Sequence, residues 1–202
     1  MSRTPDHPVA PVFVDRWSPR SFSGEAISQA DLLTAFEAAR WAPSASNVQP
    51  WRFIFARNGD DAWPVFLDLL MPRNRLWAAQ ASALIVIASS TLVERRGEVG
   101  HNHSHSFDTG AAWANFAHQA LLLGWHTHGI GGFDRDGARA ALSIPDDFAV
   151  EAMVAIGRQG TLDTLHADFH ALEAPNGRRA LADLVFEGRF GGHSITQERS
   201  AA

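Results

Sequence analysis

The 202-residue sequence predicts one α+β or α/β domain in which helices cover a β-sheet. Segments with helical periodicity alternate with a few short strand-like runs, which is typical of a sheet flanked by helices. Hydrophobic residues make up 46% of the chain and charged residues 19%, an ordinary globular composition that argues against disorder. This length gives enough volume for a core, and no repeat or clear linker divides the chain. We therefore expect residues 1–202 to form a single domain.

The N-terminal half begins with a proline-rich stretch, residues 1–14, which predicts an extended arm. Ser28 and Asp31 form a capping-box-like pair that begins a helix, and this helix should end at residue 42 because Pro43 follows. The other elements expected here are a strand at 51–57, helices at 63–70 and 76–82, a strand buried on both faces at 84–88, and a mobile loop at 95–106.

Residues 108–123 predict the strongest helix, which is rich in alanine, apolar nearly all round and followed by Gly124 as a C-terminal cap. A helix apolar on every side lies in a core or in a subunit interface, and a 22.0 kDa subunit has little room for the first. The remaining elements expected are a loop or strand at 125–133, a helix at 134–142, a strand at 148–156, an aperiodic segment at 160–177 and an amphipathic helix at 178–186.

Composition excludes several classes of function. The net charge of −5 and the pI near 6.0 argue against bulk attraction to nucleic acid or anionic membranes, so any phosphate site must be local. The absence of cysteine excludes disulfides, thiolate zinc sites and cysteine catalysis. The longest apolar run is too short to span a bilayer, and the first residues resemble no secretory signal. We therefore expect a cytoplasmic protein without nucleic-acid or membrane partners.

Four segments carry groups suited to a phosphorylated or heterocyclic ligand. In the extended stretch Arg16-Trp17-Ser18-Pro19-Arg20, alternate side chains share one side, so two guanidinium groups and a hydroxyl converge as a phosphate site requires; a solvated basic stretch is the alternative. Gly177-Arg178-Arg179 opens the last expected helix, where an anion is favoured, or where two arginines are simply solvated.

The loop at residues 43–50, Pro-Ser-Ala-Ser-Asn-Val-Gln-Pro, lies between a helix and a strand. Its Asn and Gln amides offer both donors and acceptors to the edge of a flavin or another heterocycle, although such a turn can also bond its own backbone. In the segment at 129–134, Gly-Ile-Gly-Gly-Phe-Asp, glycines allow the backbone to approach a ligand closely, without matching a dinucleotide fingerprint.

Three alternating histidines, His101, His103 and His105, could bring imidazoles together on a metal. Their spacing does not match a usual zinc signature, and no acidic residue is interleaved. A flexible lid over a pocket is the favoured interpretation of this stretch, with metal binding as the alternative.

Taken in order, these segments resemble the FMN-dependent nitroreductase family. Residues 16–22 are similar to its R-x-S-x-R/K-x-F motif, and residues 42–51 are similar to its A-P-S-x-x-N-x-Q-P-W motif, which is the most specific match. Residues 108–125 resemble its long central helix, and 155–157 and 178–191 resemble its closing segments. The resemblance covers about residues 14–192.

The resemblance implies an α+β fold with a mixed β-sheet flanked by helices, in an intertwined homodimer that binds FMN in clefts between subunits. The central helix would build the interface, and residues 187–202 would cross to the partner. Arg16, Ser18 and Arg20 would contact the phosphate and ring region, Asn47 would face the flavin ring, the two glycines would lie near its reactive N5 edge, and Arg178 would complete phosphate binding. The full implied cofactor set is Arg16, Trp17, Ser18, Arg20, Pro43, Ser44, Ser46, Asn47, Gln49, Gly131, Gly132, Arg178 and Arg179.

Three positions depart from the family pattern and leave the substrate open. Gly131 stands where a Glu is common, Phe190 where Trp is usual, and Asn176 where Lys is common, so that Arg179 would compensate. The resemblance implies a ping-pong reaction in which NADH or NADPH reduces the flavin and a small nitroaromatic, quinone or enal acceptor reoxidises it. No catalytic side chain and no metal are expected. The alternatives are azoline oxidation, dehalogenation or flavin fragmentation on the same cofactor, and a non-catalytic flavin-binding protein.

Overall fold

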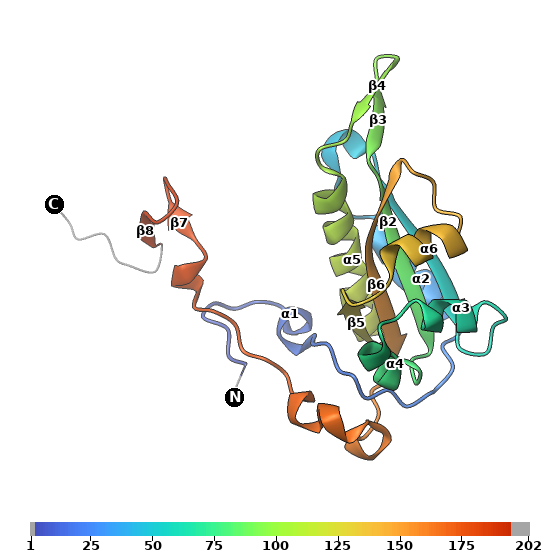
Figure 1. Cartoon of the computed structure of the whole chain (residues 1–202). Coiled ribbons are helices and arrows are strands. Elements are labelled where there is room, and N and C mark those ends of the chain that lie inside the picture. The colour runs from blue at the N-terminus through green and yellow to red at the C-terminus, as the bar shows by residue number, and fades with distance from the viewer. Residues whose placement is uncertain (1–2, 195–202) are drawn as a thin grey trace.

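A four-stranded sheet with helices on both faces forms the body of the protein (Figure 1), seen in a computed structural model that describes residues 3–194. Its strand order is β1 (Trp51–Arg57), β2 (Ala83–Ser90), β6 (Phe148–Gly157) and β5 (His126–Ile130). The sequence predicts an α+β fold, and the structure has one. Every pair of these strands is antiparallel, so the mixed sheet expected is antiparallel throughout the described residues.

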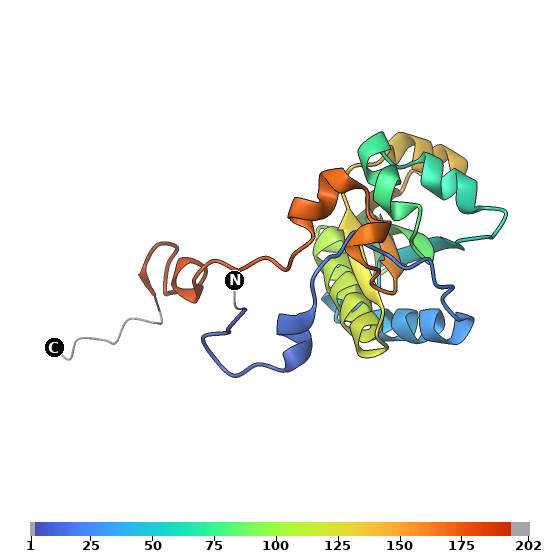
Figure 2. The same cartoon turned by 90° about the horizontal axis from the view of Figure 1, so that it is seen from below.

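Strand β2 is buried on both faces because its apolar side chains alternate between two cores. Leu84 and Val86 pack into the core beneath α3 (Trp63–Asp68), α4 (Pro72–Ala78) and α6 (Arg135–Ala141). Ile85 and Ile87 pack into the core beneath α2 (Gln29–Arg40) and α5 (His105–Leu122). The uninterrupted apolar run in the sequence therefore marks the middle layer of a three-layer arrangement (Figure 2).

Local sequence signals set the ends of the two long helices. The Ser28 hydroxyl accepts the N–H of Asp31, as the capping pair predicts, and the helix ends at Arg40, two residues before the expected position. Helix α5 begins at His105, three residues before its expected start. Gly124 follows it with φ +79°, a left-handed conformation that glycine adopts at helix ends.

The composition of helix α5 predicts burial on every side, but the helix is buried on one side only. Its Ala112, Phe116 and Ala120 face the sheet and α2, whereas Phe107 near its start is 83% exposed and Leu122 at its end is 68% exposed. Burying two such side chains would be worth about 1.5–3 kcal/mol each. The apolar outer side is therefore open to a further partner.

Three N-terminal expectations are wrong. Residues 11–15 form a short helix, α1 (Pro11–Asp15), within the arm expected to be extended; proline suits the first turn of a helix. The helix expected at 76–82 is α4, which starts at Pro72 for the same reason. The expected mobile loop is a hairpin of β3 (Leu92–Arg95) and β4 (Glu98–His101). Its two turn residues, Arg96 and Gly97, both have positive φ, as a tight antiparallel turn requires.

The C-terminal part departs further from the expected pattern. The amphipathic helix expected at 178–186 is a single 3₁₀ turn, Leu181–Asp183, followed by the small hairpin of β7 (Phe186–Glu187) and β8 (His193–Ser194). Short 3₁₀ turns, Leu162–Thr164 and Ala167–Leu172, lie within the aperiodic segment before it. The chain start and this end leave the body together (Figures 1 and 2), and the expected crossing tail lies partly outside the described residues. Among those residues, none of the helices has the length and apolar character that a membrane crossing needs.

The aromatic cluster between α2, α5 and β1 provides a test of the core. Phe116 is 1% exposed, and its ring lies 5.0 Å from that of Phe36 and 6.4 Å from that of Phe53. We expect Phe116→Ala to lower the unfolding free energy by about 3–5 kcal/mol, because it leaves a cavity. Urea unfolding measures this loss, with Phe55→Ala as the control at a 40% exposed ring of the same cluster. Equal losses in the two variants would contradict the assigned packing.

Candidate functional site

Three arginines from distant parts of the chain lie close together. Both terminal nitrogens of Arg3 donate to the carbonyl oxygen of Arg16 at 3.2 Å, and Arg16 Nη1 donates to Ser18 Oγ at 3.2 Å. Burial lowers the pKa of Arg16, and the positive charges of Arg178 and Arg3 lower it further. Within residues 3–194, no ion pair joins any of the three to a carboxylate. Such a concentration of guanidinium groups favours binding of an anion.

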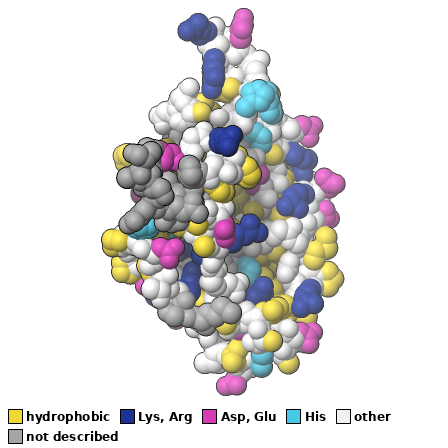
Figure 3. All heavy atoms as spheres, turned by 90° about the vertical axis from the view of Figure 1, so that its left-hand side faces the viewer, with side chains coloured by type: hydrophobic (Ala, Val, Ile, Leu, Met, Phe, Trp, Pro, Cys, Tyr) yellow, Lys and Arg dark blue, Asp and Glu magenta, His cyan; other side chains and the backbone are white. Residues whose placement is uncertain are grey.

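A cavity of about 560 Å³ lies beside these arginines, between the two chain ends. Arg3, Arg178 and Arg179 line it together with apolar side chains of both ends, among them Phe13 and Leu184. Figure 3 shows the face on which the chain ends lie, with dark blue basic side chains spread among hydrophobic ones; the chain has no lysine, so all of these are arginines. Arg178 lines this cavity. The sequence predicts that Arg178 lies at the start of a helix, but no α-helix begins there among the described residues.

The segment that carries Arg20 lies against strand β5. Trp17, Ser18 and Arg20 are half-buried, and Nδ1 of His128 in β5 lies 2.9 Å from the carbonyl oxygen of Pro19. The His128 ring packs against Trp77, with ring centroids 4.5 Å apart. The structure therefore places the first expected motif beside β5, an outer strand of the sheet. The strand residue that it contacts, His128, precedes Gly131 by three positions.

The loop at 43–49 has a strained backbone. Ser46, Asn47 and Gln49 have φ of 53°, 55° and 53°, in the left-handed region that non-glycine residues rarely occupy. The hydroxyl of Ser44 accepts the N–H of Gln49, and the buried carboxylate of Asp108 accepts the N–H of Ala45 at 3.0 Å. Strain held in place by such contacts is typical of functional sites.

The side chains of this loop differ in whether they bond its own backbone. Ser44 and Gln49 bond the backbone of their own loop, since Gln49 Nε2 also donates to the carbonyl of Asn47. Pro43, Ser46 and Asn47 are exposed, and the amide of Asn47 forms no hydrogen bond with the described residues. The Asn47 amide thus projects from a strained backbone with no partner among the described residues.

The two glycines after β5, Gly131 and Gly132, differ in the space around them. A Cβ at Gly132 would lie 2.6 Å from Asn74 Nδ2, which donates to the carbonyl of Gly132 at 2.9 Å. A Cβ at Gly131 would meet no described atom within 4 Å, so the chain leaves open space there. Asn74 on α4 was not predicted as part of the site, because no sequence motif marks it. Arg135, also not predicted, donates to the carbonyl of Gly131 at 3.3 Å.

A single chain does not bring all of the expected residues together. The glycine segment and Arg20 lie by β5, whereas the Asn47 loop precedes β1, and these are the two outer strands of the sheet. Two further strands separate them.

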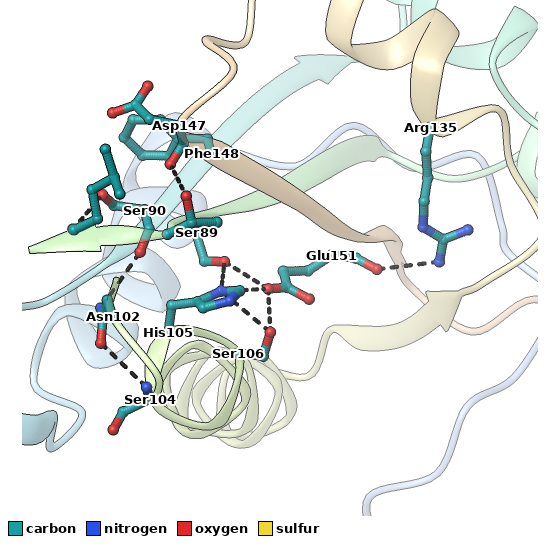
Figure 4. A network of polar contacts seen from close by, with 12 residues as sticks. Ser89, Ser90, Asn102, Ser104, His105, Ser106, Arg135, Asp147, Phe148 and Glu151 are labelled. Carbon is teal, nitrogen blue, oxygen red and sulfur yellow. Dashed lines mark hydrogen bonds and ion pairs between the residues drawn. The ribbon is translucent and has the colours of Figure 1, made fainter. Parts of the chain in front are cut away.

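His105 takes part in a structural network, whereas His101 and His103 are exposed. His105 Nδ1 lies 2.7 Å from Ser89 Oγ, and Glu151 Oε1 accepts from the hydroxyls of Ser89 and Ser106 at 2.6 Å each (Figure 4). The contacts join β2, β6 and the start of α5. Within the described part of the chain, no group of three or more His, Cys, Asp or Glu side chains is arranged to hold a metal ion.

His128 should make stability depend on pH. Burial lowers its pKa below the usual 6.5, and Arg20 adds to this, while the bond to Pro19 and the charge of Glu173 oppose it. The unfolded chain therefore takes up this proton at a higher pH than the folded chain, so the unfolding free energy falls as pH drops below 6.5.

We expect His128→Gln, which keeps an N–H donor but does not titrate, to lose less stability than the unmodified protein between about pH 7.5 and pH 5.5. Urea unfolding at the two pH values gives the comparison. His7→Gln is the control, because His7 lies in the N-terminal arm away from β5. An unchanged pH dependence in His128→Gln would mean that another group is responsible.

Known proteins resemble this chain in sequence and structure. The sequence profile of the nitroreductase family matches residues 14–71. A crystal structure of an oxidoreductase described as containing FMN is 48% identical, with a TM-score of 0.91 over 94% of this chain and 96% of its own. A candidate nitroreductase of Desulfovibrio desulfuricans solved in complex with FMN is 25% identical, with a TM-score of 0.69 over 92% and 99%. A candidate NADH dehydrogenase/NAD(P)H nitroreductase of Streptomyces coelicolor is 32% identical over 92 residues, 44% of this chain and 43% of that protein.

Proposed function

The chain belongs to the nitroreductase family, and from this premise we propose that it binds FMN and transfers hydride from NADH or NADPH to a small oxidised acceptor. The observation that carries the proposal is the group of Arg3, Arg16 and Arg178 without a described carboxylate partner. An FMN phosphate supplies the two negative charges and the acceptor oxygens that such a group lacks. The FMN named for the 48% identical structure supports the same ligand.

The residues of the site fit this cofactor. Arg16, Arg178 and the Ser18 hydroxyl would hold the phosphate, with Arg179 nearby in the cavity. The free amide of Asn47 would meet the polar edge of the ring, and the open space at Gly131 would admit its reactive side. When bound, FMN supplies the hydride-transfer chemistry, which no side chain of this protein can perform.

The chain's own contribution would be to bind and orient. Backbone N–H groups of the glycine segment would donate to the ring, with their position fixed by Asn74 and Arg135 through the carbonyls of Gly132 and Gly131. No side chain is proposed as a general acid or base. The absence of a side chain at Gly131 would leave room for a planar acceptor of the nitroaromatic, quinone or enal type.

A homodimer would complete the site. The Asn47 loop and the glycine segment lie by opposite outer strands, so the loop of one subunit would reach the glycine segment of the other. The exposed Phe107 and Leu122 on α5 would then be buried, and the chain ends that leave the body would pack on the partner. Gly110 on the same helix has no neighbour within 4 Å of an added Cβ, which suits close approach of a second helix.

An absorbance spectrum tests the central claim. We expect the protein, purified or reconstituted with FMN, to show flavin bands that bleach when NADH or NADPH is added without oxygen. Bound flavin that resists bleaching by both would favour another FMN reaction or a binding role. A protein that takes up no FMN would remove the basis of the proposal.

Substitution of the arginines tests the phosphate site. We expect Arg16→Ala and Arg178→Ala each to weaken FMN binding about tenfold or more, since a hydrogen bond to a charged group is worth about 1.5–3 kcal/mol. Flavin fluorescence titration gives the dissociation constants. The matched control is Arg95→Ala on the β3–β4 hairpin, which removes the same charge from an exposed strand. Unchanged affinity in both test variants would show that the phosphate binds elsewhere.

A further inference from the structure

Two side chains distant in sequence hold the backbone around Arg20. The carboxylate of Glu173 accepts the N–H of Arg20 with both oxygens, at 3.0 and 2.9 Å, and the N–H of Ser21 at 2.9 Å. On the other side of the peptide chain, His128 Nδ1 lies 2.9 Å from the carbonyl of Pro19. The three residues from Pro19 to Ser21 are therefore fixed by a strand and by the C-terminal segment together.

These contacts engage both oxygens of the Glu173 carboxylate. A carboxylate accepts charge-assisted hydrogen bonds from backbone N–H groups in the same way as from a guanidinium. Because Glu173 is bound to two consecutive N–H groups, its charge lies close to Arg20 without forming an ion pair with it. Arg20 instead rests on an apolar surface, with its guanidinium 5.9 Å from the ring centroid of the buried Phe169.

A second arginine shares this surface. The guanidinium of Arg73, from α4, lies 5.3 Å from the centroid of the same Phe169 ring. Among the ion pairs within the described residues, none involves Arg20 or Arg73. Arg20 and Arg73 thus place two positive charges at one ring, with no ion-pair partner for either among the described residues.

We propose that Glu173 is a positioning residue, which fixes the backbone of Arg20 and leaves its guanidinium available to FMN. This inference rests on the proposed function. Ordering a backbone segment costs conformational entropy, and a segment that is fixed before the ligand arrives does not meet that cost on binding. The segment around Arg20 lies outside any helix or strand, so its order comes from single contacts: Glu173 holds the N–H groups of Arg20 and Ser21, and the N–H of Gly160 bonds the carbonyl of Ser21.

The substitution Glu173→Gln tests this role. It keeps the size of the side chain, but removes its charge and turns one acceptor oxygen into a donor that faces the N–H groups. We expect FMN to bind about tenfold more weakly in fluorescence titration. The matched control is Asp163→Asn, which removes the same charge from an exposed position of the same segment and should leave the affinity unchanged.

A double-mutant comparison separates positioning from general support of the fold. If Glu173 acts through Arg20, Glu173→Gln should weaken FMN binding less than about twofold when Arg20→Ala is already present. The same tenfold loss in both backgrounds would overturn the proposal. So would an unchanged affinity of Glu173→Gln in the otherwise unmodified protein.

A second variant guards against loss of folding. Glu173→Asp keeps the charge and shortens the reach by one methylene, so its loss of affinity should be smaller than that of Glu173→Gln; an equal or larger loss would contradict the proposal. Thermal unfolding of each variant shows that a folded protein was titrated. An unmodified protein that fails to bind FMN would instead refute the proposed function, and the two failures are thus distinguishable.

Discussion

The burial of the sheet on both faces is the constraint on which the rest of the structure depends. Because α2 and α5 cover one face of the central strand β2, and α3, α4 and α6 cover the other, this strand offers no open face to a ligand. Groups free to bind must therefore lie along the outer strands or in the segments that precede and follow them. The Asn47 loop precedes one outer strand, and the glycine segment follows the other.

Charge is arranged according to the same division. The interior is mostly apolar, with Asp108 and a few hydroxyl and amide side chains as its polar members among the described residues, and Asp108 fixes the loop that carries Asn47. Arg3, Arg178 and Arg179 line the cavity between the two chain ends. The carboxylates of Glu173 and Asp108 both accept hydrogen bonds from backbone N–H groups, and each thereby orders a segment of the candidate site. Glu173 thereby orders the segment around Arg20 without forming an ion pair with it.

Much of the fold follows from local patterns in the sequence. The alternation of apolar residues predicts β1, the continuous apolar run predicts β2, and the capping pair at Ser28 predicts the start of α2. These signals depend on residues close in sequence. Arg16, Arg178 and the two loops of the candidate site could be selected in the same way, because each lies in a contiguous motif, whereas Arg3 lies in none.

The remainder depends on contacts that sequence spacing does not reveal. Asn74 and Glu173 act on backbone groups 58 and 153 positions away, so no short motif contains both partners. Arg178 was expected at a helix start, but the following residues form one 3₁₀ turn away from the body, where few contacts could stabilise a longer helix. The polar residues of the β3–β4 hairpin lack the apolar alternation typical of a strand, so the sequence predicts a loop there. The structure has a strand pair closed by a turn at Arg96 and Gly97.

The β3–β4 hairpin is also a site at which the chain could accept an insertion. Its turn stands at the opposite end of the molecule from the two chain ends (Figure 1), and both of its strands are largely exposed. An added peptide or inserted domain at Arg96–Gly97 would disturb neither the buried layers nor the arginine group. This turn should therefore tolerate an insertion of extra residues, an epitope or an attachment tag better than either terminus does.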